Sequence, residues 1–207
     1  RSSLIQTSQA PTMTTDSARI EAAVAEILAA IGEDPTRDGL RETPRRVASA
    51  AAEMFAGVGL DAASPLLAPS GFDSTSEPVG EFVALRGIAF RSVCEHHLLP
   101  FVGTAAVVFA PRDRIVGLGA IAEVVSIAAA RPQLQERLTD QIAEAVERGL
   151  DARGALVLIE ASHGCVTARG PRQTDAITAT VAARGTLAEP AGRAEAMALA
   201  TGAGLES

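Results

Sequence analysis

The sequence Cys94-Glu95-His96-His97-Leu98-Leu99-Pro100-Phe101 contains one of the chain's two cysteines and two of its three histidines. The other cysteine and histidine lie together in His163-Gly164-Cys165. Core residues without a common role would not be expected to gather in two short windows. The clustering therefore indicates that the two windows share one chemical task.

Three interpretations of the cysteines compete. A disulfide between Cys94 and Cys165 needs an oxidising compartment, which nothing in the sequence indicates. Buried thiols acting as small hydrophobes are a second possibility. The histidines favour a third, a metal site, because Cys94-x-x-His97 supplies two ligands from one turn and Cys165 supplies another. Thiolate and imidazole together suit zinc, and three protein ligands leave a fourth position for water, as in catalytic sites.

The remaining histidines fit the same site. His163 and Cys165 are two residues apart, so on a strand both side chains would face the same side. His96 is next to the expected ligand His97. An imidazole that titrates near neutrality beside a metal-bound water is a suitable proton carrier.

Composition limits the classes of protein that this chain can be. Its 207 residues, 47% of them hydrophobic, suit one domain with extensions and are too apolar for a disordered chain. No apolar run approaches the roughly 20 residues that span a bilayer, so we expect no membrane insertion. Residues 1–17 lack the apolar core of a signal peptide, which favours a cytoplasmic location.

The net charge and the absence of lysine argue against two further classes of function. The net charge of −7 argues against a protein that binds nucleic acid by neutralising its phosphates. All 18 basic residues are arginine, so neither a Schiff-base lysine nor a P-loop lysine is available.

Two helices are expected in the first part of the chain. Asp16 can cap the first, whose apolar stripe ends at Gly32. Thr43-Pro44 can start the second, with threonine as the cap, and this helix stops at Gly57. Together they predict a helical hairpin. Residues 57–78 are rich in glycine and proline, which predicts a linker or a long surface loop.

From residue 80 the pattern is that of mixed strands and helices. Two strands, two helices and two strands are expected, followed by a short helix after Ala188. The expected strands are 82–92, 101–110, 155–161 and 174–183, and the expected helices are 117–130 and about 134–149. Four strands make a small sheet with exposed edges, which predicts pairing with other subunits.

Four blocks of the sequence, in this order, resemble the GTP cyclohydrolase I family. The blocks are Asp34-Pro35-Thr36-Arg37-Asp38-Gly39-Leu40 with Glu42-Thr43-Pro44-x-Arg46-Val47, then Cys94 to Phe101, then Arg131-Pro132-Gln133-Leu134-Gln135-Glu136-Arg137-Leu138-Thr139, and finally His163-Gly164-Cys165-x-x-x-Arg169-Gly170. Any one block could arise by chance, whereas four in order with family-like gaps are a strong signal. The resemblance covers roughly residues 18–185.

The resemblance implies an α+β tunnelling fold (T-fold), a four-stranded antiparallel sheet with an inserted helix pair, preceded by an N-terminal helical hairpin. The chain would divide into a flexible tail (1–15), an N-terminal helical region (16–57), a linker loop (58–78), the T-fold catalytic domain (79–187) and a C-terminal tail (188–207). Family members assemble as a homodecamer of two pentamers with active sites between subunits. Their sheets close into a barrel, which would remove the exposed edges.

The resemblance also implies a reaction, the ring opening of GTP. Carried over by position, the metal ligands for Zn²⁺ are Cys94, His97 and Cys165, the catalytic histidines are His96 and His163, and the substrate contacts are Gln135 and Glu136 to guanine and Arg169 to the triphosphate. Zinc lowers the pKa of a bound water toward about 7, which allows attack on guanine C8 at neutral pH. His163 would protonate N7, C8 would leave as formate, and the product would be 7,8-dihydroneopterin triphosphate, the first step of tetrahydrofolate and pterin biosynthesis.

One segment departs from the family pattern. The family usually has Gly-Leu-Ser-Lys-Ile-x-Arg where this chain has Gly117-Leu118-Gly119-Ala120-Ile121-Ala122-Glu123. The resemblance implies that the lost serine, lysine and arginine help to bind the triphosphate. A loss of ~1.4 kcal/mol per contact would be about tenfold in affinity. Either Arg112, Arg114 or Arg172 compensates, or the chain is a paralogue that acts on another purine nucleotide or serves as a non-catalytic zinc-binding assembly.

Overall fold

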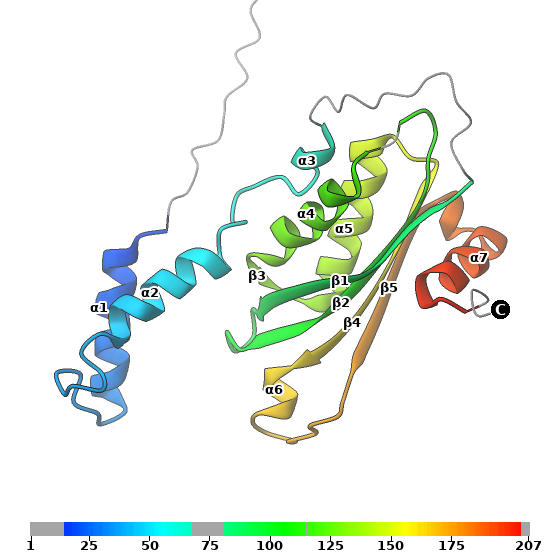
Figure 1. The fold of residues 1–207 in the computed structure, drawn as a ribbon. Coiled ribbons are helices and arrows are strands. Elements are labelled where there is room, and N and C mark those ends of the chain that lie inside the picture. Colours follow the sequence, from blue (N-terminus) through cyan, green and yellow to red (C-terminus); the bar gives the residue numbers. More distant parts are fainter. Residues whose placement is uncertain (1–14, 68–80, 115, 204–207) are drawn as a thin grey trace, which may run out of the picture.

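The computed structural model describes residues 15–67, 81–114 and 116–203, which form an α+β fold. Its elements are α1 (Ser17–Ala30), α2 (Thr43–Met54), α3 (Ser64–Leu67), β1 (Val83–Cys94), β2 (Pro100–Ala110), α4 (Leu118–Ala129), β3 (Pro132–Gln133), α5 (Gln135–Leu150), β4 (Gly154–His163), α6 (Gly164–Thr167), β5 (Thr178–Gly185), the 3₁₀ turn η1 (Thr186–Ala188) and α7 (Pro190–Thr201). A curved sheet stands at the centre, with α4 and α5 on one face and α7 on the other (Figure 1).

The strand order in the sheet is β3-β1-β2-β4-β5. Neighbouring long strands are antiparallel, whereas the short β3 runs parallel to β1, with Val93 opposite Pro132 and Cys94 opposite Gln133. The expected four-stranded antiparallel sheet therefore needs correction, because the sheet has five strands and is mixed. The extra strand forms where Arg131-Pro132 interrupts the helical stretch, since the residue before a proline is biased toward extended backbone.

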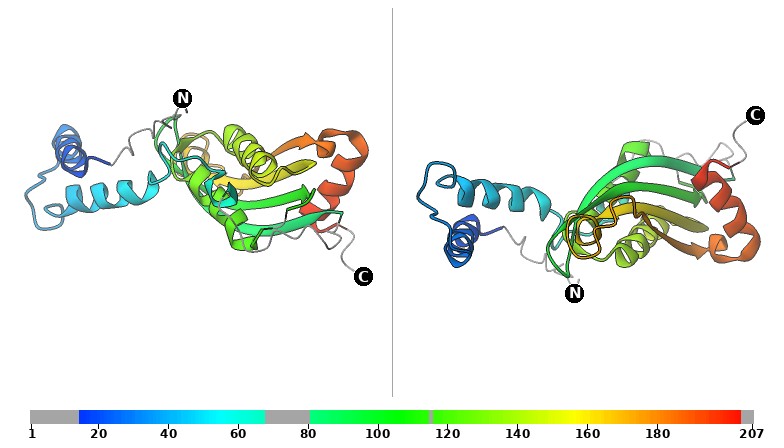
Figure 2. Two further views of the ribbon diagram at one scale, coloured as in Figure 1. Left: turned by 90° about the horizontal axis from the view of Figure 1, so that it is seen from above. Right: turned by 90° about the horizontal axis from the view of Figure 1, so that it is seen from below.

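Strand β4 is buried along most of its length because helices cover both of its faces. It contains the continuous apolar run Ala155-Leu156-Val157-Leu158-Ile159, where a strand with one wet face would alternate apolar and polar residues. The main core lies between the sheet and α4 and α5, and a smaller one lies under α7 (Figure 2). The segment after Ala188, expected to be a tail with a short helix, thus adds a helix to the packed fold.

Helix α5 ends one residue later than expected. Gly149 was expected to end it, but the helix continues to Leu150, and Asp151 follows in the left-handed conformation at φ 48°. Gly149 has a packing role instead, because a Cβ there would lie 2.7 Å from the side chain of Leu66. Leu66 belongs to α3 and is fully buried, so this part of the expected 58–78 linker packs on the domain. Residues 68–78 of that linker lie outside the described residues, as do residues 1–14 of the expected flexible tail.

Helices α1 and α2 extend away from the sheet (Figure 1). Asp16 caps α1 as expected and accepts a hydrogen bond from the backbone N–H of Arg19 at 3.1 Å. The N-cap of α2 is Glu42 and not Thr43, which is already helical, and Glu42 makes no side-chain cap. Figure 2 shows α1 nearly end-on while α2 lies across the view, so the two helices pack against each other at a steep angle.

The N-terminal helices are joined to the domain through a few polar contacts. The backbone N–H of Gly57 donates to the carbonyl of Ala130 at 2.8 Å, and Arg131 donates to the carbonyl of Leu60 at 2.9 Å. Asp61 pairs with Arg148 on α5 at 2.6 Å. Within the described part of the chain, no helix is both long and apolar enough to cross a bilayer.

Candidate metal and catalytic site

The two cysteine–histidine windows meet at one end of the sheet. Phe101 at the start of β2 pairs directly with His163 at the end of β4. The next residue, Gly164, lies against the turn before β2, where a Cβ would come within 2.9 Å of the carbonyl oxygen of Pro100. The fold therefore brings together windows that are separated by more than sixty residues in the sequence.

The turn between β1 and β2 presents the first window. Cys94 ends β1 and is buried, and its backbone N–H donates to the carbonyl of Leu99 at 2.9 Å. The carbonyl of Cys94 accepts from the N–H of Leu98 at 2.9 Å, and Leu98 has a positive φ of 52°. This closed turn makes Cys94-x-x-His97 a compact unit.

Both cysteines are free thiols, so the structure contains no Cys94–Cys165 disulfide. Cys165 lies in the first turn of α6, while His163 ends β4, so the alternation of a strand does not relate these two side chains as expected. In the part of the chain that the structure describes, no three side chains of His, Cys, Asp or Glu converge closely enough to hold a metal ion.

The donor atoms nevertheless have the chemistry that zinc requires. The Nε2 atom of His97 lies 3.0 Å from a guanidinium nitrogen of Arg169. Because a guanidinium can only donate, this Nε2 accepts and carries no hydrogen. A neutral imidazole with two reduced thiols is a donor set that suits zinc.

His163 is held in place by two neighbours. Its ring stacks on that of Phe101, with centroids 4.7 Å apart and planes 2° from parallel. Its Nε2 lies 2.7 Å from Oε1 of Gln135. Burial lowers the pKa of His163, and the negative charge of Glu136 opposes that shift. The ring is therefore ordered, and burial favours its neutral form.

The two residues expected to contact guanine have different environments. Gln135 is 2% exposed, and the two hydrogens on its Nε2 are shared among three acceptors at 2.9–3.1 Å, the carbonyls of Ile159 and Thr178 and the hydroxyl of Thr180. Glu136 is exposed in the first turn of α5. Of the two, only Glu136 presents its side chain to solvent in the single chain.

His96 is exposed in the turn, and its ring lies edge-on to that of His97 at 6.4 Å. Its neighbour Glu95 forms a two-pronged ion pair with Arg137 on α5, at 2.6 and 3.1 Å. The hydrogen bond from Arg137 lowers the pKa of Glu95. The ion pair fastens the turn to α5.

Sequence reasoning missed several residues that support the site. Arg137 belongs to the third sequence block, but its ion pair with Glu95 joins residues 42 positions apart. No local sequence pattern predicts such a contact. Phe101 was part of the first block, but its stacking on His163 depends on strand register. Thr180, which contacts Gln135 from β5, carried no sequence signal at all.

Comparison with known proteins identifies the family. The family model described as GTP cyclohydrolase I matches residues 20–201. The chain belongs to the GTP cyclohydrolase I family. GTP cyclohydrolase 1 of Leifsonia xyli subsp. xyli is 60% identical over 184 residues, which cover 89% of this chain and 95% of that protein.

Two other members of the GTP cyclohydrolase I family extend the comparison. GTP cyclohydrolase 1 of Thermobifida fusca is 50% identical over 90% of this chain and 89% of its own length. The Rhodopirellula baltica protein of the same name is 48% identical over 92% of this chain and 81% of its own length. Among solved structures, apo archaeosine synthase QueF-Like aligns with 52% of this chain and 97% of its own, at a TM-score of 0.44 and 18% identity, which is too distant to support an argument.

The segment that departs from the GTP cyclohydrolase I pattern lies on α4. Glu123 is exposed there. Figure 1 shows that α4 begins near α3, whereas α6 and the β1–β2 turn lie at the opposite end of the sheet. Two of the arginines expected to compensate have protein partners: Arg112 pairs with Asp151 at 3.7 Å, and Arg114 donates to two backbone carbonyls.

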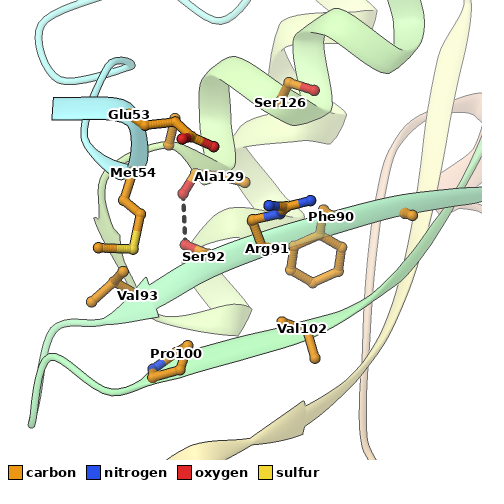
Figure 3. Close-up of a pocket in the computed structure, with 12 residues that line it drawn as sticks. Glu53, Met54, Phe90, Arg91, Ser92, Val93, Pro100, Val102, Ser126 and Ala129 are labelled. Carbon is orange, nitrogen blue, oxygen red and sulfur yellow. Dashed lines mark hydrogen bonds between the residues drawn. The ribbon is translucent and has the colours of Figure 1, made fainter. Parts of the chain in front are cut away.

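A cavity of about 340 Å³ lies between α2, α4 and strands β1 and β2. Figure 3 shows Met54 of α2 reaching toward Val93 and Glu53 of α2 pointing toward Ala129, whose carbonyl accepts a hydrogen bond from Ser92. Its lining flanks the Cys94 turn but contains none of the expected ligands or catalytic histidines. This cavity is therefore distinct from the cysteine–histidine site.

Proposed function

We propose that this chain is a GTP cyclohydrolase I that opens the imidazole ring of GTP, releases formate and forms 7,8-dihydroneopterin triphosphate. The observation that carries the proposal is the meeting of the Cys94–His97 turn with His163 and Cys165 at one end of the sheet. That meeting occurs in a chain 60% identical to a protein named GTP cyclohydrolase 1.

The proposed metal site consists of Cys94, His97 and Cys165, which would hold Zn²⁺. When bound, zinc supplies a water acidic enough to act as a nucleophile at neutral pH. The free thiols support this ligand set, and Nε2 of His97 would exchange its hydrogen bond from Arg169 for the metal. Free thiols also agree with a reducing compartment, and we place the protein in the cytoplasm on that ground.

The catalytic work falls to the two histidines that are not ligands. His163 is ordered by its neighbours and would protonate N7 of guanine, which makes C8 more electrophilic. His96 is exposed beside the proposed ligand His97 and would carry protons to and from solvent. Proton transfer is a task to which an imidazole side chain is suited.

The proposed substrate contacts lie around this pair. The exposed carboxylate of Glu136 would accept hydrogen bonds from the ring N–H groups of guanine, with Gln135 next to it. Arg169 lies 3.0 Å from His97, so its guanidinium is near the proposed metal ligand and can bind a phosphate oxygen with a forked pair of donors.

The proposed assembly is a decamer of two pentamers, with T-fold sheets closed into barrels and active sites between subunits. Two described sheet edges support it. Strand β1 pairs with β3 only at Val93 and Cys94, and β5 has a single partner, β4. Open edges of this length favour pairing with another chain.

A second candidate function is a paralogue with weakened triphosphate binding. It is favoured by the exposed Glu123 and by the engagement of Arg112 and Arg114 within the protein. Such a protein would act on a purine nucleotide with fewer phosphates, or it would bind zinc and assemble into an oligomer without catalysing a reaction.

The experiment is a steady-state assay of pterin fluorescence, after oxidation of the product, with GTP, GDP and guanosine, alongside metal analysis. We expect bound zinc and the highest kcat/KM for GTP. A preference for GDP or guanosine would support the paralogue, and zinc without pterin would support the non-catalytic form. The Cys94→Ala variant should lose both metal and activity, whereas His163→Ala should lose activity and keep the metal.

A further inference from the structure

A continuous hydrogen-bond chain runs from the backbone of α5 to the ring of His163. Oγ1 of Thr139 lies 2.7 Å from the carbonyl oxygen of Gln135 and 2.6 Å from Oγ1 of Thr180. The Thr180 hydroxyl lies 3.1 Å from Nε2 of Gln135, and Oε1 of that amide lies 2.7 Å from Nε2 of His163. Gln135 and Thr139 are buried, so these bonds do not compete with bulk water.

Every bond in this chain has a fixed direction. A backbone carbonyl can only accept, so the Thr139 hydroxyl donates its one hydrogen to the carbonyl of Gln135. Thr139 must then accept from Thr180, whose own hydrogen is used in that bond. Thr180 has only lone pairs left for Gln135, so it accepts from Nε2 of the amide.

Two backbone carbonyls hold the amide the same way round. Nε2 of Gln135 also lies 3.1 Å from the carbonyl oxygen of Ile159 and 2.9 Å from that of Thr178. A flipped amide would turn its oxygen toward these two carbonyl oxygens, neither of which can donate to it. The oxygen Oε1 therefore faces His163, and since it can only accept, the ring nitrogen Nε2 carries the hydrogen.

We infer that Gln135 is a positioning residue that holds neutral His163 in the Nε2–H tautomer, and that Nδ1 is the nitrogen that takes up a proton from solvent and then gives it to the substrate. The tautomer follows from the hydrogen bonds alone, whereas the role of Nδ1 rests on the proposed function. The stack on Phe101 fixes the ring plane. With Nε2 engaged, Nδ1 is the ring nitrogen that has a free lone pair.

This role differs from a direct contact between Gln135 and guanine, which the family resemblance implies. Both polar atoms of the side chain are bonded within the protein, and the side chain is 2% exposed. A guanine contact predicts that loss of the amide weakens substrate binding. A positioning role predicts that loss of the amide changes the His163 ring and slows catalysis.

The tautomer can be measured on zinc-loaded protein labelled with ¹⁵N histidine, since the chain has only three histidines. A His163→Gln variant assigns the signals of this ring. In the wild type we expect a protonated Nε2 and a bare Nδ1. In Gln135→Met the neutral ring should lose its single tautomer and show the tautomer mixture of a free imidazole, and in Gln135→Glu, which keeps an acceptor oxygen, it should stay Nε2–H. A wild-type Nδ1–H ring, or an unchanged ring in Gln135→Met, would overturn the inference.

Gln141→Met is the matched control, because Gln141 lies on the same helix and bonds Gln133 rather than His163. It should leave the ring signals unchanged. In kinetics, Gln135→Met should lower kcat about tenfold or more with KM unchanged, since general acid–base catalysis contributes about 10²–10⁴-fold. A raised KM with unchanged kcat would assign Gln135 to substrate binding instead. If the wild type makes no pterin at all, the proposed function fails while the ¹⁵N signals still decide the tautomer.

Discussion

Phe101 and His163 are cross-strand partners whose rings stack face to face at 4.7 Å. Phe101 is fully buried, so the imidazole of His163 rests on an immobile apolar surface. The proposed general acid is therefore oriented by the same strand pairing that builds the sheet. A change at Phe101 should affect both the core and the chemistry.

We expect Phe101→Leu to lower the stability by about 0.5–1.5 kcal/mol through loss of the aromatic pair, and also to lower kcat, because the His163 ring loses its support. Urea unfolding and pterin assays measure the two effects. Phe109→Leu is the control, since Phe109 is buried on the same strand but pairs with Ala155 far from the site. It should lose stability with little change in kcat. Equal loss of kcat in both variants would contradict a specific role for the stack.

The ion pair of Glu95 and Arg137 should matter more for zinc than for folding. Arg137→Met frees the turn that carries Cys94 and His97, so we expect zinc affinity to fall about tenfold or more, as for other residues that orient metal ligands. The free energy of unfolding should change little, because the pair is exposed and surface ion pairs contribute little to stability. Competition with a chelating dye measures the affinity. Arg184→Met, which breaks the bidentate pair with Asp140, should leave it unchanged.

The attachment of the N-terminal segment should weaken in acid. The hydrogen bond from Arg148 lowers the pKa of Asp61, so the folded state binds this proton less readily than the unfolded state. The pair therefore stabilises the fold above the unfolded pKa of about 3.9 and loses this effect as the pH falls through the lower folded value. Asp61→Asn should flatten this part of the stability–pH curve, measured by urea unfolding from neutral to acid pH. An unchanged curve would show that the ion pair contributes nothing.

Zinc removal should abolish activity and leave the fold intact. The main core consists of apolar residues between the sheet and helices α4 and α5. This core contains many more residues than the cysteine–histidine turn, so the fold should not depend on the metal. We expect a strong chelator to abolish pterin formation without reducing the helical circular dichroism signal. Added zinc should restore pterin formation. Loss of secondary structure on chelation would mean that the metal is structural.

Restoring the family's positive charges on α4 should restore triphosphate binding. Ala120→Lys with Glu123→Arg is expected to lower KM for GTP about tenfold per regained contact and to leave guanosine unaffected. The gain should shrink at high salt, because exposed charges are screened. The control is Glu147→Arg on α5, to be compared with Glu123→Arg alone, because each of these changes the net charge by +2. An equal gain from the control would mean that net charge alone acts.

The sequence predicted most of the elements because their signals are local. Asp16 caps α1 as expected, and the break at Arg131-Pro132 separates α4 from α5. Predictions that depended on neighbours in space were less complete. Strand β3 is two residues long and is defined only by its partner β1. The N-cap of α2 is Glu42 rather than Thr43, because Thr43 is already the first helical residue.

The same contrast holds for the candidate site. The two clustered windows could be found from the sequence, since cysteine and histidine are rare in this chain. Their supporting residues could not, because the roles of Phe101 and Thr180 arise from strand register and those of Arg137 from a contact across the fold. The pairing of β4 with β5, which brings Thr180 opposite Ile159, is decided by the whole sheet.

Strand β5 is the last strand of the described sheet, and it supplies the carbonyl of Thr178 and the hydroxyl of Thr180 to the amide of Gln135. A neighbouring chain that adds a strand along this border would stiffen both groups at once. Contacts with another subunit there would thus act on the imidazole of His163 through only one intervening side chain, Gln135. The orientation of this proposed catalytic ring would then depend on whether a neighbouring chain is paired with β5.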